Sequence, residues 1–174
     1  MPNWVKNNLR IRMNGEKALE VLEMIKDEAG NMTFEKVAPT PEELLTEPSP
    51  QRDKEKAKKF EEKYGADDWY NWRCKNWGCK WDAGESAFYE QDGYSMVTFT
   101  TPWSPPKEFV RSLSKMFPNV TFEMQYAEEG GGYIGELTAE GGDVGVYMPN
   151  DLDVVAMNDR IWNEEWITNL EGEE

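Results

Sequence analysis

Two cysteines and four tryptophans lie within one short run, WYNWRCKNWGCKWDAG at residues 69–84. Cys74 and Cys79 are separated by four residues, and the chain contains no histidine. A closed structural zinc site takes four Cys or His ligands in recognisable pairs, so this pair cannot form one alone. The spacing also differs from the C-x-x-C of redox centres. We therefore expect two ordinary thiols, no metal site and no cofactor.

The tryptophans of this run permit two interpretations. Trp69 and Trp72 are three positions apart and Trp77 and Trp81 are four apart, so each pair shares one side of a local helix. An indole buries a large apolar area while its N–H seeks an acceptor, as in a packed core. The same rings can stack on a small molecule or a peptide. The alternative to a core is therefore a ligand groove formed by Trp69, Trp72, Trp77 and Trp81.

The sequence offers little for catalysis. Without histidine, the most common general base is missing. The run GGGYIG at 130–135 lacks the lysine and the following helix of a phosphate-binding P-loop. Asp151 and Asp153 resemble only a fragment of a calcium loop, because its other ligands and its invariant glycine are missing. We therefore predict a protein that is not an enzyme.

The negative charge is concentrated at one end of the chain. The formal net charge is −15, and residues 116–174 contain 14 acidic side chains and one basic side chain, Arg160. This balance opposes binding to duplex nucleic acid, which requires Lys and Arg to neutralise phosphates. It favours either simple solubility or an acidic surface that meets a basic partner protein. The residues expected to form that surface are Glu128, Glu129, Glu136, Glu140, Asp143, Asp151 and Asp153.

Hydropathy places the protein away from membranes. No apolar run approaches the ~20 residues that a membrane helix needs. The amino terminus, MPNWVKNNLRIRMN, lacks the apolar segment of a signal peptide. With two cysteines and no export signal, we expect a reducing cytoplasm and no membrane partner. The sequence leaves the oligomeric state open.

The spacing of apolar residues predicts the secondary structure. Strands are expected at 5–13, 86–91, 94–100, 119–126, 131–139 and 143–148, with turns at Asp92-Gly93 and at 140–142. Helices are expected at 16–30, 53–65 and 104–117. In the first, Ala18, Leu22, Ile25 and Ala29 share a face and Gly30 ends the helix. In the last, Ser104 is the expected cap, and the buried stripe is Phe109, Val110, Leu113, Met116 and Phe117.

The element order predicts the fold class. Strand, helix, strand, strand, helix, strand is the βαββαβ order of a ferredoxin-like α+β sandwich. We expect one domain over residues 1–148, with a long insertion at about 31–84 and an added carboxy-terminal hairpin. Residues 149–174 would form an acidic extension.

Several motifs also resemble a known family. MPNW at the start, NWGCKWDA at 76–83, TPWSPP at 101–106 and FPNVTFEMQYAEEGGGYIGE at 117–136 are similar to motifs of the YubB-like family of phage and plasmid proteins. This resemblance implies a ferredoxin-like domain and a mobile-element origin, and it carries no catalytic residues. With the acidic end, it predicts a protein that binds a host protein in the bacterial cytoplasm. A specific version is inhibition of a nucleic-acid-binding defence protein, with carboxylates occupying a groove meant for phosphates.

Overall fold

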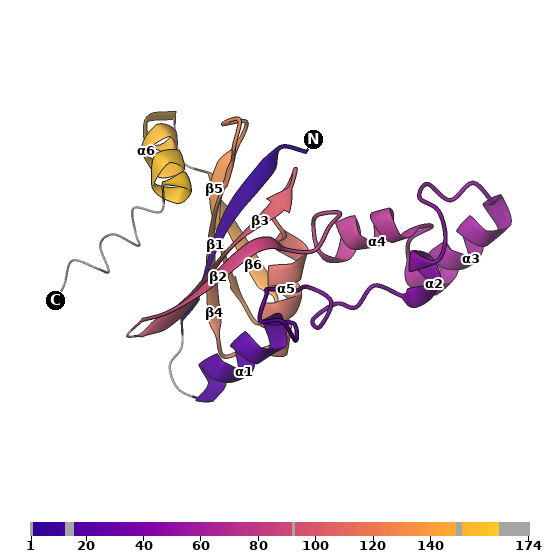
Figure 1. The fold of residues 1–174 in the computed structure, drawn as a ribbon, viewed down its shortest axis with the longest axis horizontal. Helices are drawn as coiled ribbons and strands as arrows, with labels where there is room; N and C mark the ends of the chain where they lie inside the picture. Colours follow the sequence, from indigo (N-terminus) through magenta and orange to yellow (C-terminus); the bar gives the residue numbers. More distant parts are fainter. Residues whose placement is uncertain (1, 13–15, 92, 149–150, 164–174) are drawn as a thin grey trace.

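The computed structural model describes residues 2–12, 16–91, 93–148 and 151–163, and these form a sheet with helices on both faces (Figure 1). The elements in chain order are β1 (Trp4–Arg12), α1 (Glu16–Ile25), α2 (Glu42–Leu45), α3 (Lys54–Tyr64), α4 (Trp69–Asn76), β2 (Gly84–Gln91), β3 (Tyr94–Pro102), α5 (Lys107–Met116), β4 (Thr121–Glu128), β5 (Ile134–Glu140), β6 (Asp143–Tyr147) and α6 (Asp151–Trp162).

The sheet has six strands in the order β2-β3-β1-β4-β5-β6. Every neighbouring pair is antiparallel. Leu9, in the central strand β1, lies opposite Val97 of β3 and Met124 of β4. The first four strands with α1 and α5 therefore reproduce the predicted ferredoxin-like sandwich. The β5–β6 hairpin extends the sheet beyond β4, as its turn residues predicted.

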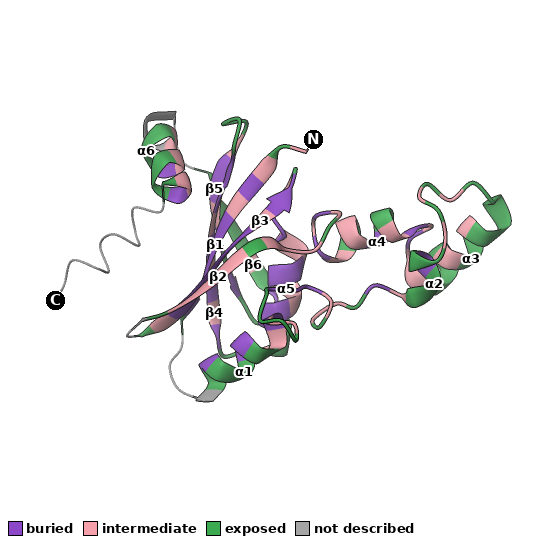
Figure 2. Cartoon of the chain, viewed as in Figure 1, coloured by how far each residue is buried: buried purple, intermediate pink, exposed green. Residues whose placement is uncertain are grey.

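The main core lies between the sheet and the two helices α1 and α5 (Figure 2). Alternate residues of β1 and β4 point into it because successive side chains of a strand face opposite ways. Leu9, Ile11, Phe122 and Met124 are all fully buried there. The polar exception is Asn7, whose amide donates hydrogen bonds to the Val5 carbonyl at 3.1 Å and to the hydroxyl of Thr101 at 2.9 Å.

Helix α6 covers part of the opposite sheet face (Figure 1). Met157 and Ile161 of α6 pack on Ala127 and Ile134, and the four residues form a second, smaller apolar cluster. The carboxy-terminal segment through Trp162 is therefore a part of the folded body. The run RIWNEEWITNL at 160–170 also predicts that Trp166 and Ile167 dock on the body, and these two residues lie outside the described part of the chain.

The predicted insertion forms an arm that extends from the body (Figure 1). We define the arm as residues 35–76, which include α2, α3 and α4. Asp53 caps α3 by accepting hydrogen bonds from the backbone N–H groups of Glu55 and Lys56, and Gly65 ends it with φ at 73°. No residue of α3 is buried, so this helix is a solvated element at the end of the arm.

Two helix boundaries differ from the predicted ones. The first helix ends at Ile25, because Lys26 pairs with Met32 in an isolated β-bridge and turns the chain back; Ala29 is exposed as a result. The helix expected from Ser104 begins at Lys107. The Ser104 hydroxyl instead donates a 2.6 Å hydrogen bond to the Gly78 carbonyl.

Side-chain partners also differ at two predicted positions. Met116, expected in the buried stripe of α5, is 45% exposed because it lies at the end of that helix. The three-residue spacing of Asp53 and Lys56 predicts an ion pair on α3. The Lys56 ammonium instead lies 2.7 Å from the Glu47 carboxylate. The Asp53 side chain is used instead as the helix cap.

Candidate functional site

The end of α4 divides the tryptophan-rich run into two parts. Trp72, within the helix, and Trp77, at its end, are 8% and 0% exposed. The Trp77 indole donates a 2.8 Å hydrogen bond to the Ala38 carbonyl and meets Phe34 edge-on, with ring centroids 5.5 Å apart. Both indoles are therefore core residues that attach the arm to the body, so they cannot form the accessible ligand groove considered for this run.

Arg73 stabilises the same junction from its more exposed side. Its guanidinium lies 4.6 Å from the Trp77 ring centroid and 5.5 Å from that of the half-buried Trp69. It also donates hydrogen bonds to Glu35 at 2.9 Å and to the Thr40 hydroxyl at 3.0 Å. The ring of Trp69 is therefore already in contact with the Arg73 guanidinium at the base of the arm.

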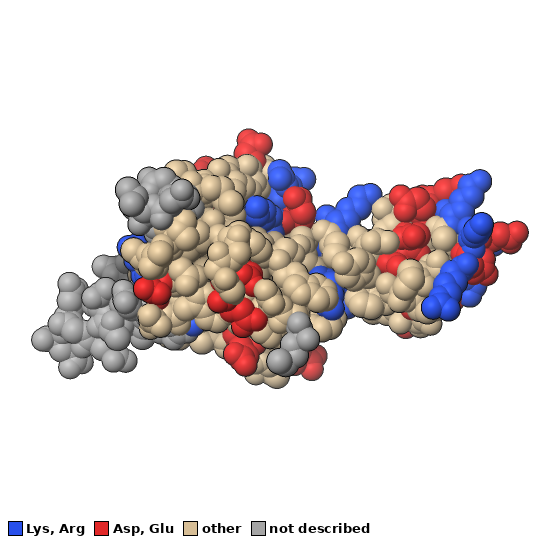
Figure 3. Space-filling model, turned by 90° about the horizontal axis from the view of Figure 1, so that it is seen from above, with Lys and Arg blue, Asp and Glu red and all other residues tan. Residues whose placement is uncertain are grey.

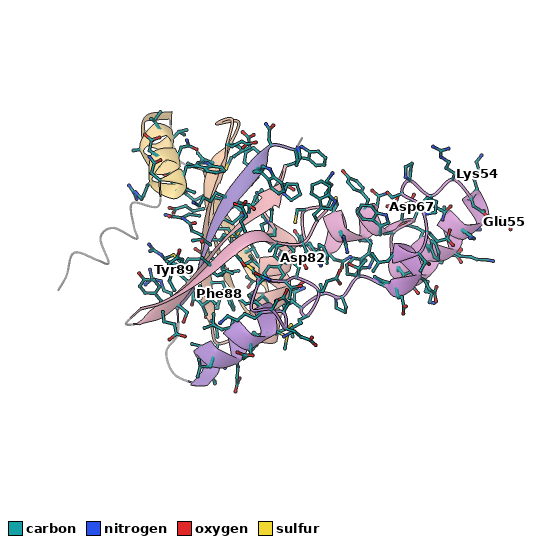
Figure 4. The ribbon with its side chains drawn as sticks, viewed as in Figure 1. Lys54, Glu55, Asp67, Asp82, Phe88 and Tyr89 are labelled. Carbon is teal, nitrogen blue, oxygen red and sulfur yellow. The ribbon has the colours of Figure 1, made fainter. Side chains whose placement is uncertain are left out.

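Asp82 joins the returning chain to the segment that enters the arm (Figure 4). Its carboxylate accepts hydrogen bonds from the Thr33 hydroxyl at 2.7 Å, the Phe34 N–H at 2.6 Å and the Ala83 N–H at 2.9 Å. Burial raises the pKa of the Asp82 carboxyl, and these three donors oppose that rise. All three donors belong to the protein, so Asp82 links the segment that returns from the arm to the segment that enters it.

The cysteines are not placed for reactivity. Both thiols are free, and Cys79 is only 1% exposed. Burial raises the pKa of the Cys79 thiol far above its ordinary value, and burial also raises the pKa of Cys74. Across the residues that the structure describes, no three Cys, Asp or Glu side chains gather closely enough to hold a metal ion.

A different set of aromatic residues is accessible. Trp81 is 39% exposed and Trp103 is 47% exposed, and their rings stack with centroids 6.4 Å apart at 27°. The ammonium of Lys80 lies 3.7 Å from each ring centroid. We call Trp81 and Trp103 the indole clamp and Lys80 its occupant. The ring of Trp4 lies 6.3 Å from that of Trp81 and extends the aromatic surface.

The clamp joins segments that are far apart in the sequence, so the sequence pattern missed Trp103, Trp4 and Lys80. The available signals were the tryptophans in MPNW and TPWSPP, each within two residues of a proline that favours a turn and therefore the surface. The Tyr133 hydroxyl donates a hydrogen bond to the Trp103 carbonyl. Burial raises the pKa of Tyr133 to about 12, so this donor keeps its proton to a higher pH than an ordinary tyrosine does.

The predicted acidic residues do not form one surface. Glu128 is 4% exposed, and its carboxylate accepts a 2.8 Å hydrogen bond from the Gly132 N–H, so it shapes the β4–β5 turn and is not part of an accessible patch. The neighbouring Glu129 is exposed and accepts a 3.0 Å hydrogen bond from the Trp4 N–H. Both residues lie at one end of the β4–β5 pair.

Three predicted carboxylates lie further along the β5–β6 hairpin. Glu136 is half-buried and accepts a hydrogen bond from the Gln125 amide at 2.5 Å. Glu140 and Asp143 face each other beside the turn, and both are exposed. At about 3.3 Å per residue, β5 separates this turn from Glu129 by roughly 20 Å. We call Glu136, Glu140 and Asp143 the hairpin carboxylates.

The remaining acidic residues are described only in part. Asp151 and Asp153 lie at the start of α6, but their side chains are outside the described part of the chain. Glu164, Glu165, Glu171, Glu173 and Glu174 also lie outside it. The hairpin carboxylates are therefore the described group on which an acidic surface can be tested.

The strand order and the two helices on one sheet face define a ferredoxin-like α+β protein. Residues 76–168 match the family model for the ferredoxin-like domain in Api92-like proteins. Because this match covers more than half of the sequence, the chain belongs to that family. The predicted ferredoxin-like family is thus confirmed in its fold, while the YubB-like name and the mobile-element origin stay predictions.

A solved structure shows the same fold at low sequence identity. The crystal structure of the protein api92 from Yersinia pseudotuberculosis superposes with a TM-score of 0.53 and 11% identity. The superposition covers 86% of this chain and 99% of that one. No curated protein matches the sequence. Within the described ranges, every helix is too short or too polar to span a lipid bilayer.

Proposed function

We propose that this protein is a non-enzymatic binding protein of a phage or another mobile element. Its target would be a basic host protein in the bacterial cytoplasm, recognised through the hairpin carboxylates. The observation that carries the proposal is the position of these carboxylates on the β5–β6 hairpin, which ends the sheet on this side. Glu140 and Asp143 face each other beside the turn, and β6 is the last strand of the sheet.

The edge combines charge with apolar surface. Val146, Tyr147 and Met148 are 48%, 57% and 57% exposed along β6 and just after it. Protein interfaces commonly join an apolar centre, which supplies affinity, to charges that steer association and select the partner. An edge strand also presents unpaired backbone groups to which another strand can add. A basic protein segment would satisfy all three features.

The side of the hairpin that faces α5 has two basic side chains, Arg111 and Lys115, beside Gly142. Arg111 donates a hydrogen bond to the Gly142 carbonyl at 3.3 Å, and its guanidinium lies 2.9 Å from Glu108. The arm carries both signs of charge in close succession (Figure 3). The side that faces α5 and the arm are therefore both less favourable for a basic partner than the outer side of the hairpin.

The resemblance to phage and plasmid proteins supports a target in the host cell. The specific form of the proposal is that the target binds nucleic acid and that the carboxylates occupy its phosphate-binding groove. Such a target would bind duplex DNA or this protein but not both, so DNA should compete for the complex.

The first test compares two variants of equal net charge. One is Glu136→Gln, Glu140→Gln, Asp143→Asn at the hairpin; the other is Glu55→Gln, Glu61→Gln, Glu62→Gln on α3. Affinity capture from bacterial lysate at about 50 mM and about 500 mM salt exploits the screening of exposed charges. The wild type and the α3 variant should retain the same basic protein at low salt, and the hairpin variant should lose it.

The captured protein is then purified and its association rate is measured. We expect the hairpin variant to associate about tenfold more slowly, because steering depends on the local field. If both variants bind the captured protein as the wild type does, the hairpin is not the binding surface and the proposal fails.

A further inference from the structure

The indole clamp holds a cation without the help of a carboxylate. The Lys80 ammonium lies 3.7 Å from the ring centroids of both Trp81 and Trp103. Among the described residues, no ion pair involves Lys80. The contact is therefore a double cation–π interaction, in which the negative faces of two rings attract one ammonium group.

The backbone of Trp103 is held in a conformation that a non-glycine residue rarely adopts. Its φ is 62°, in the left-handed region, where a side chain with a Cβ is strained. The Trp103 N–H donates a 2.9 Å hydrogen bond to the Asn3 carbonyl, and the Trp103 carbonyl accepts one from Tyr133. Two tertiary hydrogen bonds therefore fix this residue while its large ring remains half-exposed.

Strain of this kind persists only where surrounding contacts enforce it, and it is enriched at ligand-binding sites. The backbone strain disfavours folding, and a ring that stays half-exposed recovers only part of the stabilisation that full burial would supply. Packing does not explain the arrangement, because Trp81 and Trp103 are the exposed members of the tryptophans that the structure describes, whereas Trp72 and Trp77 fill the core.

We infer that the indole clamp is a recognition site for a lysine side chain of a partner protein, and that Lys80 occupies it in the free protein. The occupant shows the chemistry that the clamp accepts, namely a primary ammonium on a flexible four-carbon stem. Binding requires Lys80 to leave, so the partner lysine exchanges one cation–π contact for an equivalent one. The site adds a second contact to the proposed function and rests on it for the basic partner.

Charge near the clamp agrees with a cationic ligand. The exposed Glu129 accepts a hydrogen bond from the Trp4 N–H, and the Trp4 ring lies 6.3 Å from that of Trp81. An acidic residue beside an aromatic surface attracts a basic segment towards it. The clamp lies at the end of the sheet opposite the hairpin turn, so the two surfaces can be altered separately.

The test uses peptides in place of the partner. The probes are acetyl-Gly-Lys-Gly-amide, the same peptide with norleucine in place of lysine, and tetramethylammonium, each titrated while the indole N–H resonances are followed by NMR. The variants are Lys80→Met, which removes the ammonium from the clamp and keeps the approximate length of the side chain, and Trp103→Ala. Lys107→Met is the matched control, because Lys107 lies 5.3 Å from the Tyr126 ring centroid outside the clamp.

We expect Lys80→Met to bind the lysine peptide about tenfold more tightly than the wild type, because an internal competitor lowers apparent affinity in proportion to its occupancy. Lys107→Met should bind as the wild type does. Trp103→Ala should show no binding, and the norleucine peptide should not bind to any variant. All four proteins should have the same melting temperature within a few degrees, because the changed side chains are not in the core.

Other results would overturn the inference. Equal affinity of the wild type and Lys80→Met would show that Lys80 does not occupy the binding site. Equal binding of the norleucine peptide would show an apolar site. Tetramethylammonium binding more tightly than the lysine peptide would assign the clamp to a free small cation. The hairpin variant should bind the peptide normally, so failure of this inference is distinguishable from failure of the proposed function.

Discussion

A tryptophan's environment in this protein depends on whether it lies within α4, at its end or beyond it. Trp77, at the end of the helix, meets Phe34 and donates to the Ala38 carbonyl, whereas Trp81 lies four residues further on and reaches the surface. The four indoles of one short run therefore divide between structural residues and an accessible site.

Truncating these two residues should give different results. Trp77→Ala removes a fully buried ring and leaves a cavity, so we expect a loss of about 3–5 kcal/mol in the free energy of unfolding. Trp81→Ala removes a half-exposed ring and should cost less than about 1 kcal/mol. Urea unfolding of both variants measures the difference. A similar loss in both would show that the indole clamp is a part of the core.

Glu128 illustrates a carboxylate whose charge stabilises the fold. The Gly132 N–H lowers the pKa of Glu128, with help from the Asn3 side chain and the Gly130 N–H. Because the folded pKa is lower than the unfolded one, the native state binds this proton less tightly. The stabilisation is therefore complete above the ordinary value of 4.5 and is lost as the pH falls through the lowered folded pKa.

Replacing Glu128 by Gln should therefore destabilise the protein in a pH-dependent way. At pH 7 we expect a loss of about 1–2 kcal/mol, typical of a hydrogen bond to a charged group. At pH 3 and below, the difference from the wild type should shrink as the native carboxyl becomes protonated. Urea unfolding at both pH values checks this, with the exposed Glu62→Gln as the control. A loss that does not depend on pH would contradict it.

At the scale of the element, α3 and β1 represent opposite extremes. β1 is hydrogen-bonded to β3 on one side and to β4 on the other, and its inward residues form the core. α3 buries no residue and depends on its own caps at Asp53 and Gly65. Stability should accordingly be distributed unevenly, with local opening at the end of the arm.

Hydrogen exchange should show this difference directly. We expect the amides of α3 to exchange by local opening at no more than about 3 kcal/mol, and those of β1 to follow global unfolding at about 5–15 kcal/mol. Asp53→Ala removes the cap, which is worth about 1 kcal/mol, and should speed α3 exchange about fivefold while leaving β1 unchanged. Equal protection of α3 and β1 would show that the arm is more firmly held than its burial indicates.

Local signals predicted most of the elements. β2 pairs with β3 and β5 pairs with β6, as the turn residues predicted, because two-residue and glycine-rich turns act over a few positions. The predicted start of α5 was wrong because the Ser104 hydroxyl donates a hydrogen bond to the carbonyl of Gly78, a residue distant in the sequence, and does not cap the helix. A cap preference is a local tendency, and a tertiary hydrogen bond overrode it.

The site was less predictable than the fold. Glu128 and Glu129 are identical in type and adjacent, yet one is buried under a turn and the other is exposed. The partners of the indole clamp come from segments on both sides of the β2–β3 hairpin. Sequence periodicity indicates which face of an element is apolar, but it does not indicate which distant segments will meet.

At the scale of the whole molecule, the arm is inserted between elements of the sheet in the sequence but leaves the strand pairing intact. The chain leaves after α1 and returns at β2, which is the edge strand of the sheet. Among the strands of the described chain, β2 pairs only with β3, which follows it directly. The register of every strand pair is therefore independent of how many residues the arm contains.

This topology has a consequence for how the family varies. Closing a longer loop costs only about 0.6 kcal/mol for each doubling of its length. Insertions and deletions near α3, where no residue is buried, should accumulate among relatives at little cost to folding. The strands would keep their spacing while the arm changes in length, so the arm is the part of this fold most open to evolutionary replacement.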